Sequence, residues 1–360
     1  MNPSPRADAT VRCLLLLGAA GIPLSLLWDY SWESTIGIDL VSSPPHVANY
    51  LAVALAAIGA LALIRRAGGV RLGRWHAPAG AWIALWGALA FVTGYLFDRW
   101  WAAGYGLAAG IWHPPQLLKT VAFFAIAIGA WLAQERRGTP YSIAGGVVLA
   151  LIFTVTLATA FANRQHSAAF HQLACGTYPV VLVALAITGR QRLPATTAAL
   201  VAMLLTAAMV WLLPLVPGSP QVAPIYHPRD HLLPPPFPPL LILPALAVDA
   251  LLGLFPKRTA RPPGWPHATE VGLAFFIIFL AVQWPFAQFL LSPGADHWLF
   301  AGGGKHWPFF LRIDPTAEAA FWKMPGDEFD LRSALVAAGL AILAARIGLW
   351  IGSWLKRAQR

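Results

Sequence analysis

The chain has 360 residues, of which 58% are apolar and only 11% are charged, and its formal net charge is +10. A soluble domain carries about 25% charged residues, so this composition excludes a soluble globular enzyme as well as a disordered or fibrous protein. The two cysteines, Cys13 and Cys175, lie in apolar stretches, which excludes a disulfide framework and a thiolate metal cluster.

Ten apolar runs are long enough to cross a bilayer, because even the shortest, of about 18 residues, spans about 27 Å as a helix. Polar or Pro- and Gly-rich breaks separate these runs. The sequence therefore predicts an all-α, polytopic bundle of transmembrane helices that forms a single integral membrane domain over residues 1–360. The predicted spans are 11–28, 47–64, 80–97, 117–134, 142–161, 172–189, 196–215, 236–255, 270–291 and 333–355.

Lys and Arg residues gather in alternate loops. Sixteen of the 25 lie on the side that includes both termini, which predicts that both termini are cytoplasmic. The basic excess thus orients the chain and indicates no nucleic-acid partner. Trp28-Asp29-Tyr30, rather than a small-residue cleavage site, follows the first apolar run, so we expect an uncleaved first span. The protein is predicted to be a multi-pass protein of a bacterial inner membrane, with the lipid bilayer as its partner.

The first four spans contain an internal repeat, with units at about 11–64 and 80–134. In each unit a span ends near an aspartate, Asp29 or Asp98, and a glycine follows eight residues later. A Pro-Pro pair then begins the next span. A repeated interfacial hairpin explains the tryptophans and prolines of the pattern. It does not explain the carboxylates, because an ionisable group at the membrane end of a span is costly and usually functional.

The first repeat unit carries four candidate metal ligands, Asp29, Glu33, Asp39 and His46. If the first helix continues through Asp29 and Glu33, their side chains share one face, because they are four residues apart. Two carboxylates this close repel each other unless they share a proton or a cation. His46 returns at the start of the second span, and carboxylates with imidazole bind Cu, Zn, Fe or Mn. Capping of the loop backbone is the alternative role, especially for Asp39.

The other predicted outer loops also collect acidic and imidazole side chains. Eleven of the 15 acidic residues and eight of the ten histidines fall on the outer side. Taken singly, most of them belong to a solvated polar face, but a pair from a neighbouring loop would complete a site or cap a vestibule above it. The secondary candidate ligands are Asp98, His113, His166, His171, His227 and His231.

Two further features lie outside the repeat. Residues 292–332 form the longest predicted outer loop, and its aromatic content favours a lid or a docking segment for the membrane surface or a partner subunit. Asp249 and Arg346 lie within spans at similar depth, which favours a structural ion pair between the eighth and tenth spans, with a proton path as the alternative.

The first hairpin resembles the C subunit of the copper membrane monooxygenases, the particulate methane and ammonia monooxygenase family. That family carries Asp-x3-His-x12-His, and Asp29 and His46 match its first and last ligands without a gap. Glu33 stands at the place of the middle histidine. Asp39 falls on the Asp of the family's Arg-Asp-Thr, and Pro44 falls on the Pro of its Pro-x-His. The resemblance implies a copper site near the outer leaflet.

The second repeat unit departs from the family pattern. The family's Asn-x3-His-x13-His maps onto Asp98, Ala102 and Gln116, so both histidines are absent. In the first unit, Glu33 in place of a histidine makes the donor set harder, which favours Fe, Mn or Zn over Cu(I). The motifs cover roughly residues 20–135.

Three functions stay open at this point. The first is a membrane metalloenzyme that oxidises a small apolar substrate with O2, the substrate arriving through the lipid. The second is a non-catalytic metal-binding or scaffold subunit of a larger membrane complex, which the degenerate second unit favours. A transporter ranks last, because transporter repeats meet at the bilayer midplane and this repeat signature lies at the surface.

Overall fold

The structure is a computed structural model, and it is an all-α bundle, as the sequence predicts. It describes residues 5–37, 41–66, 70–72, 75–106, 111–158, 165–220, 230–258, 264–295, 297–301 and 328–358. The helices are α1 (Pro5–Thr35), α2 (Pro44–Arg66), α3 (Ala79–Tyr105), α4 (Pro114–Ala133), α5 (Thr139–Ala158), α6 (Ala168–Thr188), α7 (Pro194–Leu212), α8 (Ile242–Arg258), α9 (Trp265–Leu291) and α11 (Leu331–Ala358). Two short strands, β1 (Val70–Leu72) and β2 (Trp75–Ala77), pair antiparallel.

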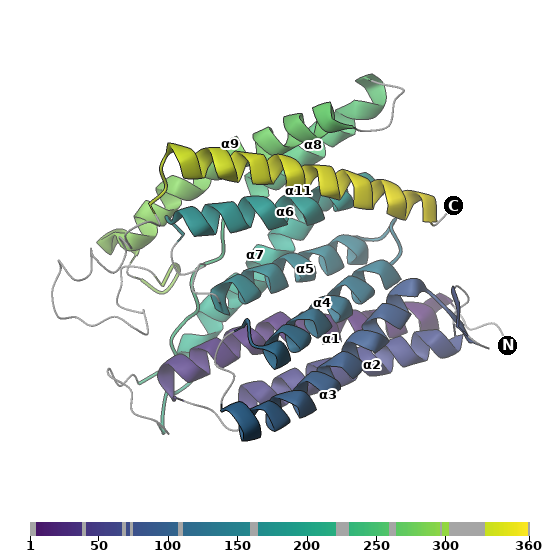
Figure 1. Cartoon of the computed structure of the whole chain (residues 1–360), viewed down its shortest axis with the longest axis vertical. Helices are drawn as coiled ribbons and strands as arrows, with labels where there is room; N and C mark the ends of the chain where they lie inside the picture. Colours follow the sequence, from purple (N-terminus) through teal and green to yellow (C-terminus); the bar gives the residue numbers. More distant parts are fainter. Residues whose placement is uncertain are drawn as a thin grey trace.

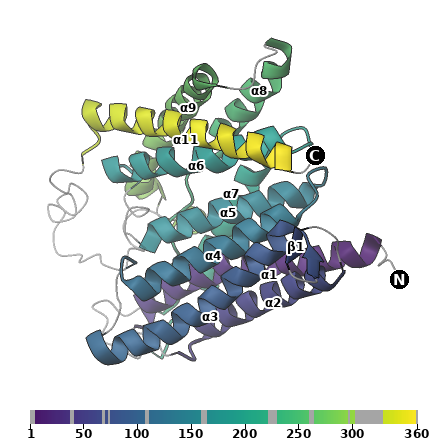
Figure 2. The same cartoon turned by 45° about the vertical axis from the view of Figure 1, so that its right-hand side comes forward.

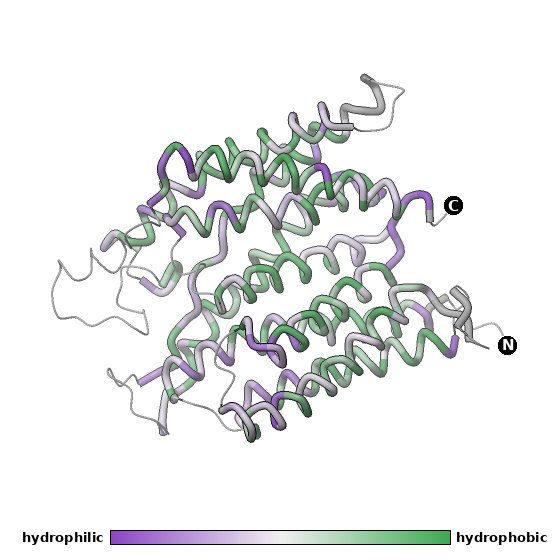
Figure 3. Tube along the Cα trace, viewed as in Figure 1, coloured by the Kyte–Doolittle hydropathy of each residue, from purple (hydrophilic) through white to green (hydrophobic). Residues whose placement is uncertain are grey.

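The helices lie side by side, as expected of an integral membrane protein. Within the described ranges, nine helices are long and apolar enough to cross a bilayer. Apolar residues occupy the middle of the bundle and hydrophilic residues gather at its two ends (Figure 3). The start of α1 and the end of α11 lie at the same end of the bundle (Figure 1). The chain is therefore a multi-pass membrane protein.

The eighth predicted span begins later than expected. Residues 236–241 are extended, and α8 starts at Ile242, so its apolar part, Ile242–Gly253, is shorter than the other spans. Prolines at 234–236, 238 and 239 explain the delay, because proline lacks the N–H that a helix interior needs. Just before this segment, the Leu233 amide donates to the Thr35 hydroxyl at the end of α1, at 2.9 Å, and within it the Leu240 amide donates to the Gln283 side chain of α9, at 2.8 Å.

The internal repeat recurs as a repeated helix contact. In each of the hairpins α1–α2 and α3–α4, glycines let the two backbones approach closely, as in membrane helix pairs generally. A Cβ atom on Gly59 would lie 2.6 Å from the backbone nitrogen of Leu15, and one on Gly129 would lie 2.5 Å from that of Ala84. The equivalent contacts are Gly59 on Leu15 and Gly18 on Ala56 in the first hairpin, and Gly129 on Ala84 and Gly87 on Ile126 in the second. Matching residues differ by 69 positions on the first helix and 70 on the second.

The second half of the chain packs around α6 and α11, which lie side by side in both views (Figures 1 and 2). Here the predicted ion pair is wrong. Asp249 accepts hydrogen bonds from the amides of Ala195 and Thr196, at 3.2 and 2.8 Å, and so caps the start of α7. The Arg346 guanidinium lies over the Trp265 ring at 5.7 Å. Asp249 thus lies against the amides of α7 that have no helical partner, and Arg346 lies against α9, so no ion pair joins them in the described structure.

The predicted outer loop at 292–332 is described only in part. Residues 302–327 and Asp296 lie outside the described residues. The prediction that this loop is a lid or docking segment falls on these residues and stays a prediction. At its start, the Leu299 carbonyl accepts a hydrogen bond from the Trp211 indole at 3.0 Å, which ties this stretch to the end of α7.

Candidate metal centre

The first hairpin places its acidic and imidazole side chains at one end of the bundle. α1 continues to Thr35, so Asp29 and Glu33 lie on one helix, one turn apart, as predicted. The helix ends where Gly37 adopts a φ of 111°, a conformation that a glycine reaches without strain. α2 then begins at Pro44, and His46 falls in its first turn.

The structure brings Asp29 and His46 together. Asp29 Oδ1 lies 3.5 Å from His46 Nε2, and the side chains are 21% and 33% exposed. This distance exceeds the 2.7–3.2 Å of an N–H···O hydrogen bond. Asp29 Oδ1 is itself buried and accepts no hydrogen bond from any group in the described structure. Two donors that each bind one metal ion at about 2.1 Å in tetrahedral geometry lie about 3.4 Å apart. The pair therefore has the spacing of two ligands of a common cation.

The other two predicted ligands are not assembled with this pair. Within the described ranges, no three His, Cys, Asp or Glu side chains are grouped closely enough to hold a metal ion. Glu33 follows Asp29 on α1 but does not complete such a group, and Asp39 lies outside the described residues. Of the four predicted ligands, the structure thus brings together one carboxylate and one imidazole.

A second polar contact lies directly beneath this pair, and the sequence analysis missed it. The Asn49 amide donates to the Ser25 hydroxyl at 2.8 Å, and Ser25 donates to the Ile22 carbonyl at 2.9 Å. Ser25 is four residues before Asp29, and Asn49 is three residues after His46, so both helices carry a second polar side chain one turn deeper in the bundle. That spacing was the signal that would have revealed them.

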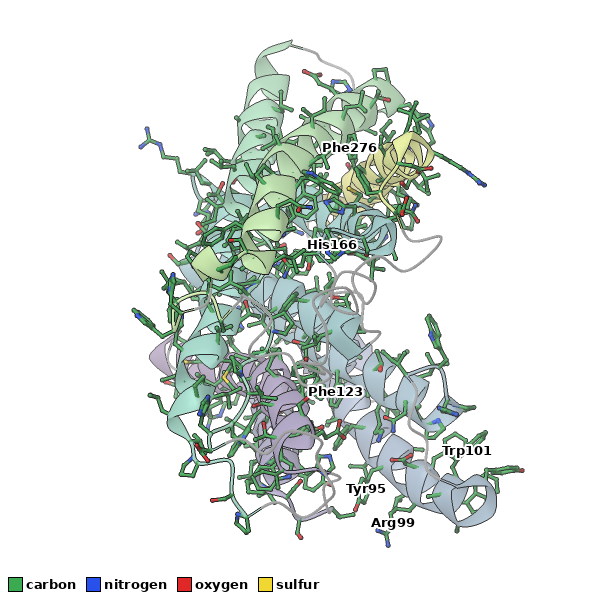
Figure 4. The ribbon with its side chains drawn as sticks, turned by 90° about the vertical axis from the view of Figure 1, so that its left-hand side faces the viewer. Tyr95, Arg99, Trp101, Phe123, His166 and Phe276 are labelled. Atoms are coloured by element: carbon green, nitrogen blue, oxygen red, sulfur yellow. The ribbon has the colours of Figure 1, made fainter. Side chains whose placement is uncertain are left out.

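Aromatic rings surround the outer part of the site. The His46 and Tyr50 rings lie 6.2 Å apart, and Tyr50 contacts Tyr95 edge-on at 5.6 Å. The Tyr50 hydroxyl donates to the Val41 carbonyl at 3.3 Å, which holds the connecting loop over the hairpin. Tyr95 belongs to α3 and is labelled in Figure 4. The second hairpin therefore reaches the site through the contact of Tyr95 with Tyr50.

In the second hairpin, Asp98 is the equivalent of Asp29, and its partner is a different residue type. Lys119 Nζ lies 2.8 Å from Asp98 Oδ2, and both side chains are mostly buried. His113 contacts the Trp101 ring at 6.4 Å. An ammonium group from the chain thus provides the positive charge that the carboxylate needs in the membrane, and Asp98 is not paired with an imidazole.

The remaining secondary candidates have other surroundings, although His231 is next to Leu232, which packs with Ile36 after the end of α1. His171 is fully buried in α6 among aromatic rings, and its Nδ1 lies 2.9 Å from the Ser167 carbonyl. His231 forms an isolated bridge with Pro217. In Figure 4 the labelled His166 lies beside α6, well apart from Trp101 at the end of α3. His227 lies outside the described residues. Among the described residues, none of these histidines forms a three-residue metal group with Asp29 and His46.

A comparison with family models, curated proteins and solved structures finds no match to this chain. The resemblance to the copper membrane monooxygenases stands on the residues of the first two hairpins alone.

Proposed function

We propose that this protein is a multi-pass membrane protein that binds one metal ion between Asp29 and His46 at the outer end of its first hairpin. The observation that carries the proposal is the 3.5 Å separation of Asp29 Oδ1 and His46 Nε2, together with the lack of a hydrogen bond to that buried oxygen in the described structure. A carboxylate oxygen without a donor in the membrane is costly. A shared cation would remove that cost.

Glu33 and Asp39 are the proposed additional ligands, by their positions in the sequence. The resemblance implies copper, whereas a donor set of carboxylates and one imidazole also suits iron, zinc or manganese. The second hairpin supports a single centre, because Lys119 already neutralises Asp98.

The proposed activity is oxidation of a small apolar substrate by O2, in which an external two-electron donor reduces the second oxygen atom to water. A bound copper or iron ion would supply the oxygen chemistry. The residues of the chain would hold the ion at the membrane boundary, and the Tyr50 ring, packed against Tyr95, lies beside His46. A substrate dissolved in the lipid then reaches the site laterally.

A non-catalytic metal-binding subunit of a larger membrane complex is the second candidate. The observation that favours it is the Lys119–Asp98 pair. In the second repeat unit a lysine neutralises the carboxylate, so this unit has a structural role and needs no metal ion. The two candidates share the metal ion and differ in O2 consumption.

Metal analysis of the detergent-purified full-length protein tests the proposal. After incubation with Cu(II), Fe(II) or Zn(II) and removal of excess metal, we expect about one ion per chain in the wild type. Asp29→Asn and His46→Gln should each lose it. The matched control is His113→Gln, which changes a histidine just before α4 in the second hairpin and should retain the ion.

A wild-type protein that stays metal-free, or a control variant that loses as much metal as His46→Gln, would overturn the proposal. Thermal unfolding of each variant separates loss of a ligand from loss of the fold. With a chemical reductant added as electron donor, substrate-dependent O2 uptake by the metal-loaded protein then selects the oxygenase, and metal binding without O2 uptake selects the subunit.

A further inference from the structure

The opposite end of the bundle contains a basic cavity that the proposed metal site does not use. Its volume is about 370 Å³, in the range of small-molecule sites. Arginines from three separate parts of the chain line it, at the end of the bundle that the Lys/Arg distribution assigns to the cytoplasm. They are Arg12 on α1, Arg136 and Arg137 between α4 and α5, and Arg190 after α6.

Two of these guanidinium groups, those of Arg12 and Arg136, each donate a hydrogen bond to a helix end but keep a buried N–H without an acceptor. Arg12 Nη1 donates to the Ala133 carbonyl at the end of α4, at 2.8 Å. Arg136 Nη2 donates to the Leu355 carbonyl near the end of α11, at 2.5 Å. In both side chains Nε is buried and has no hydrogen-bond partner in the described structure. Each arginine is therefore held in place by a helix end while it keeps an unused buried donor.

The charges in the cavity do not balance. Four arginines face a single carboxylate, Glu135, which lies 3.7 Å from Arg12 Nη1 and is 78% exposed. Burial is the main cause that lowers the pKa of Arg136, and repulsion from Arg190 acts in the same direction. The cavity thus carries excess positive charge and buried donors, which is the chemistry of an anion site.

We propose that this cavity binds the phosphate group of an anionic phospholipid of the cytoplasmic leaflet. Guanidinium groups bind phosphate oxygens through paired N–H donors, and basic pockets between membrane helices on this side bind acidic headgroups. The lining also includes apolar Pro78, Leu132 and Ala133 at the helix ends, which suit the glycerol and upper acyl region of a lipid better than a free ion.

The bound lipid would connect the two halves of the bundle. Arg12 links α1 to α4, Arg136 links the α4–α5 loop to α11, and the Arg190 amide donates to the Arg136 carbonyl at 3.0 Å. A phosphate shared by these side chains therefore adds bonds between the first hairpins and the α6–α11 pair. We expect it to raise the unfolding temperature of the whole protein.

Lipid titration of the full-length protein in neutral detergent tests this proposal. Phosphatidylglycerol should raise the unfolding temperature and appear as a retained adduct in native mass spectrometry, whereas phosphatidylcholine should do neither. The variant Arg137→Gln/Arg190→Gln removes two exposed arginines of the cavity. It should weaken phosphatidylglycerol binding by roughly 10- to 30-fold. The matched control, Arg65→Gln/Arg66→Gln, removes two exposed arginines at the end of α2, outside the cavity, and should bind like the wild type.

Two outcomes would overturn the proposal. Equal weakening in both double variants would show nonspecific attraction to a basic face. An equal rise in unfolding temperature with inorganic phosphate would assign the cavity to a free anion instead of a lipid. Because the variant positions are exposed and far from Asp29 and His46, metal content should be unchanged in both, which separates this test from that of the proposed function.

Discussion

Lys119 Nζ lies 2.8 Å from Asp98 Oδ2 inside the second hairpin, while the first hairpin has Asn49 at the position equivalent to Lys119. Asn49 reaches only as far as Ser25, one turn below the aspartate. The two repeat units therefore share a backbone arrangement but satisfy their carboxylates in different ways. In the first unit Asp29 lies beside the His46 imidazole, and in the second unit Asp98 forms an ion pair with Lys119.

The Lys119–Asp98 pair predicts a strong coupling between the two residues. Lys119→Met should lower the free energy of unfolding by roughly 1–3 kcal/mol, less than the 3–5 kcal/mol of a fully buried pair, because it leaves a partly buried carboxylate without a counter-charge. The double variant Asp98→Asn/Lys119→Met should recover much of this loss. Denaturant titration in detergent measures both. Equal stability of the single and double variants would contradict the coupling.

The glycine contacts predict that the hairpins tolerate no added methyl group where their two helices touch. Gly59→Ala and Gly129→Ala should each destabilise the protein by about 1–3 kcal/mol, because the new Cβ would overlap the backbone of the facing helix. Gly104→Ala is the control, since nothing lies within 4 Å of its Cβ position, and alanine favours a helix by up to about 1 kcal/mol. Thermal unfolding of the three variants should show two losses and no loss in the control.

The cap at the start of α7 predicts a cost for removing Asp249. Asp249→Ala should destabilise the protein by about 1–3 kcal/mol, because the amides of Ala195 and Thr196 lose their acceptor in a buried place. Asp230→Ala, at an exposed aspartate, should change stability little. Denaturant titration of both variants measures the loss. If Asp249→Ala lowers the free energy of unfolding no more than Asp230→Ala does, the cap does not contribute to stability.

The start of α11 predicts a pH-dependent contribution to stability. The Ser333 hydroxyl and amide donate to Asp330 Oδ1 at 2.6 and 2.7 Å, and these hydrogen bonds lower the pKa of Asp330 from its ordinary value of 3.8. A carboxylate whose pKa is lowered in the folded state adds stability above its unfolded pKa and loses it as the pH falls through the folded pKa. The wild type should therefore exceed Asp330→Asn in unfolding temperature at pH 6.

This advantage should shrink as the pH is lowered below 3.8. The measurement is a series of melting curves from pH 6 downward for both proteins. A constant difference across the series would mean that ionisation of Asp330 plays no part in capping the helix.

Much of the fold followed from local patterns in the sequence. Apolar runs predicted the spans, because burial of a helix in lipid depends on the length of the run. The eighth span was placed too early, since the prolines before Ile242 outweigh the apolar composition of that stretch. The sequence showed the repeat only at the polar ends of the helices. Its structural basis lies within the spans, where glycines of each hairpin contact the facing helix: Gly18 and Gly59 in the first hairpin, Gly87 and Gly129 in the second.

The candidate site was predictable only in part. The i, i+4 spacing placed Asp29 and Glu33 on one face, and the short loop returned His46 to the same end. The expectation of an ion pair for Asp249 failed because equal depth in the membrane does not determine which neighbour a side chain meets.

The sequence by itself determined the class of protein, its helices and the expected orientation of its ends, because hydrophobic length and the positions of Lys and Arg act within single segments. Only the tertiary structure decided that Asp29 lies against His46, that Asp98 lies against Lys119, and that Arg12, Arg136 and Arg190 surround one cavity. The reason is that a charged side chain in a membrane protein is satisfied by whichever group the packing of neighbouring helices brings within reach.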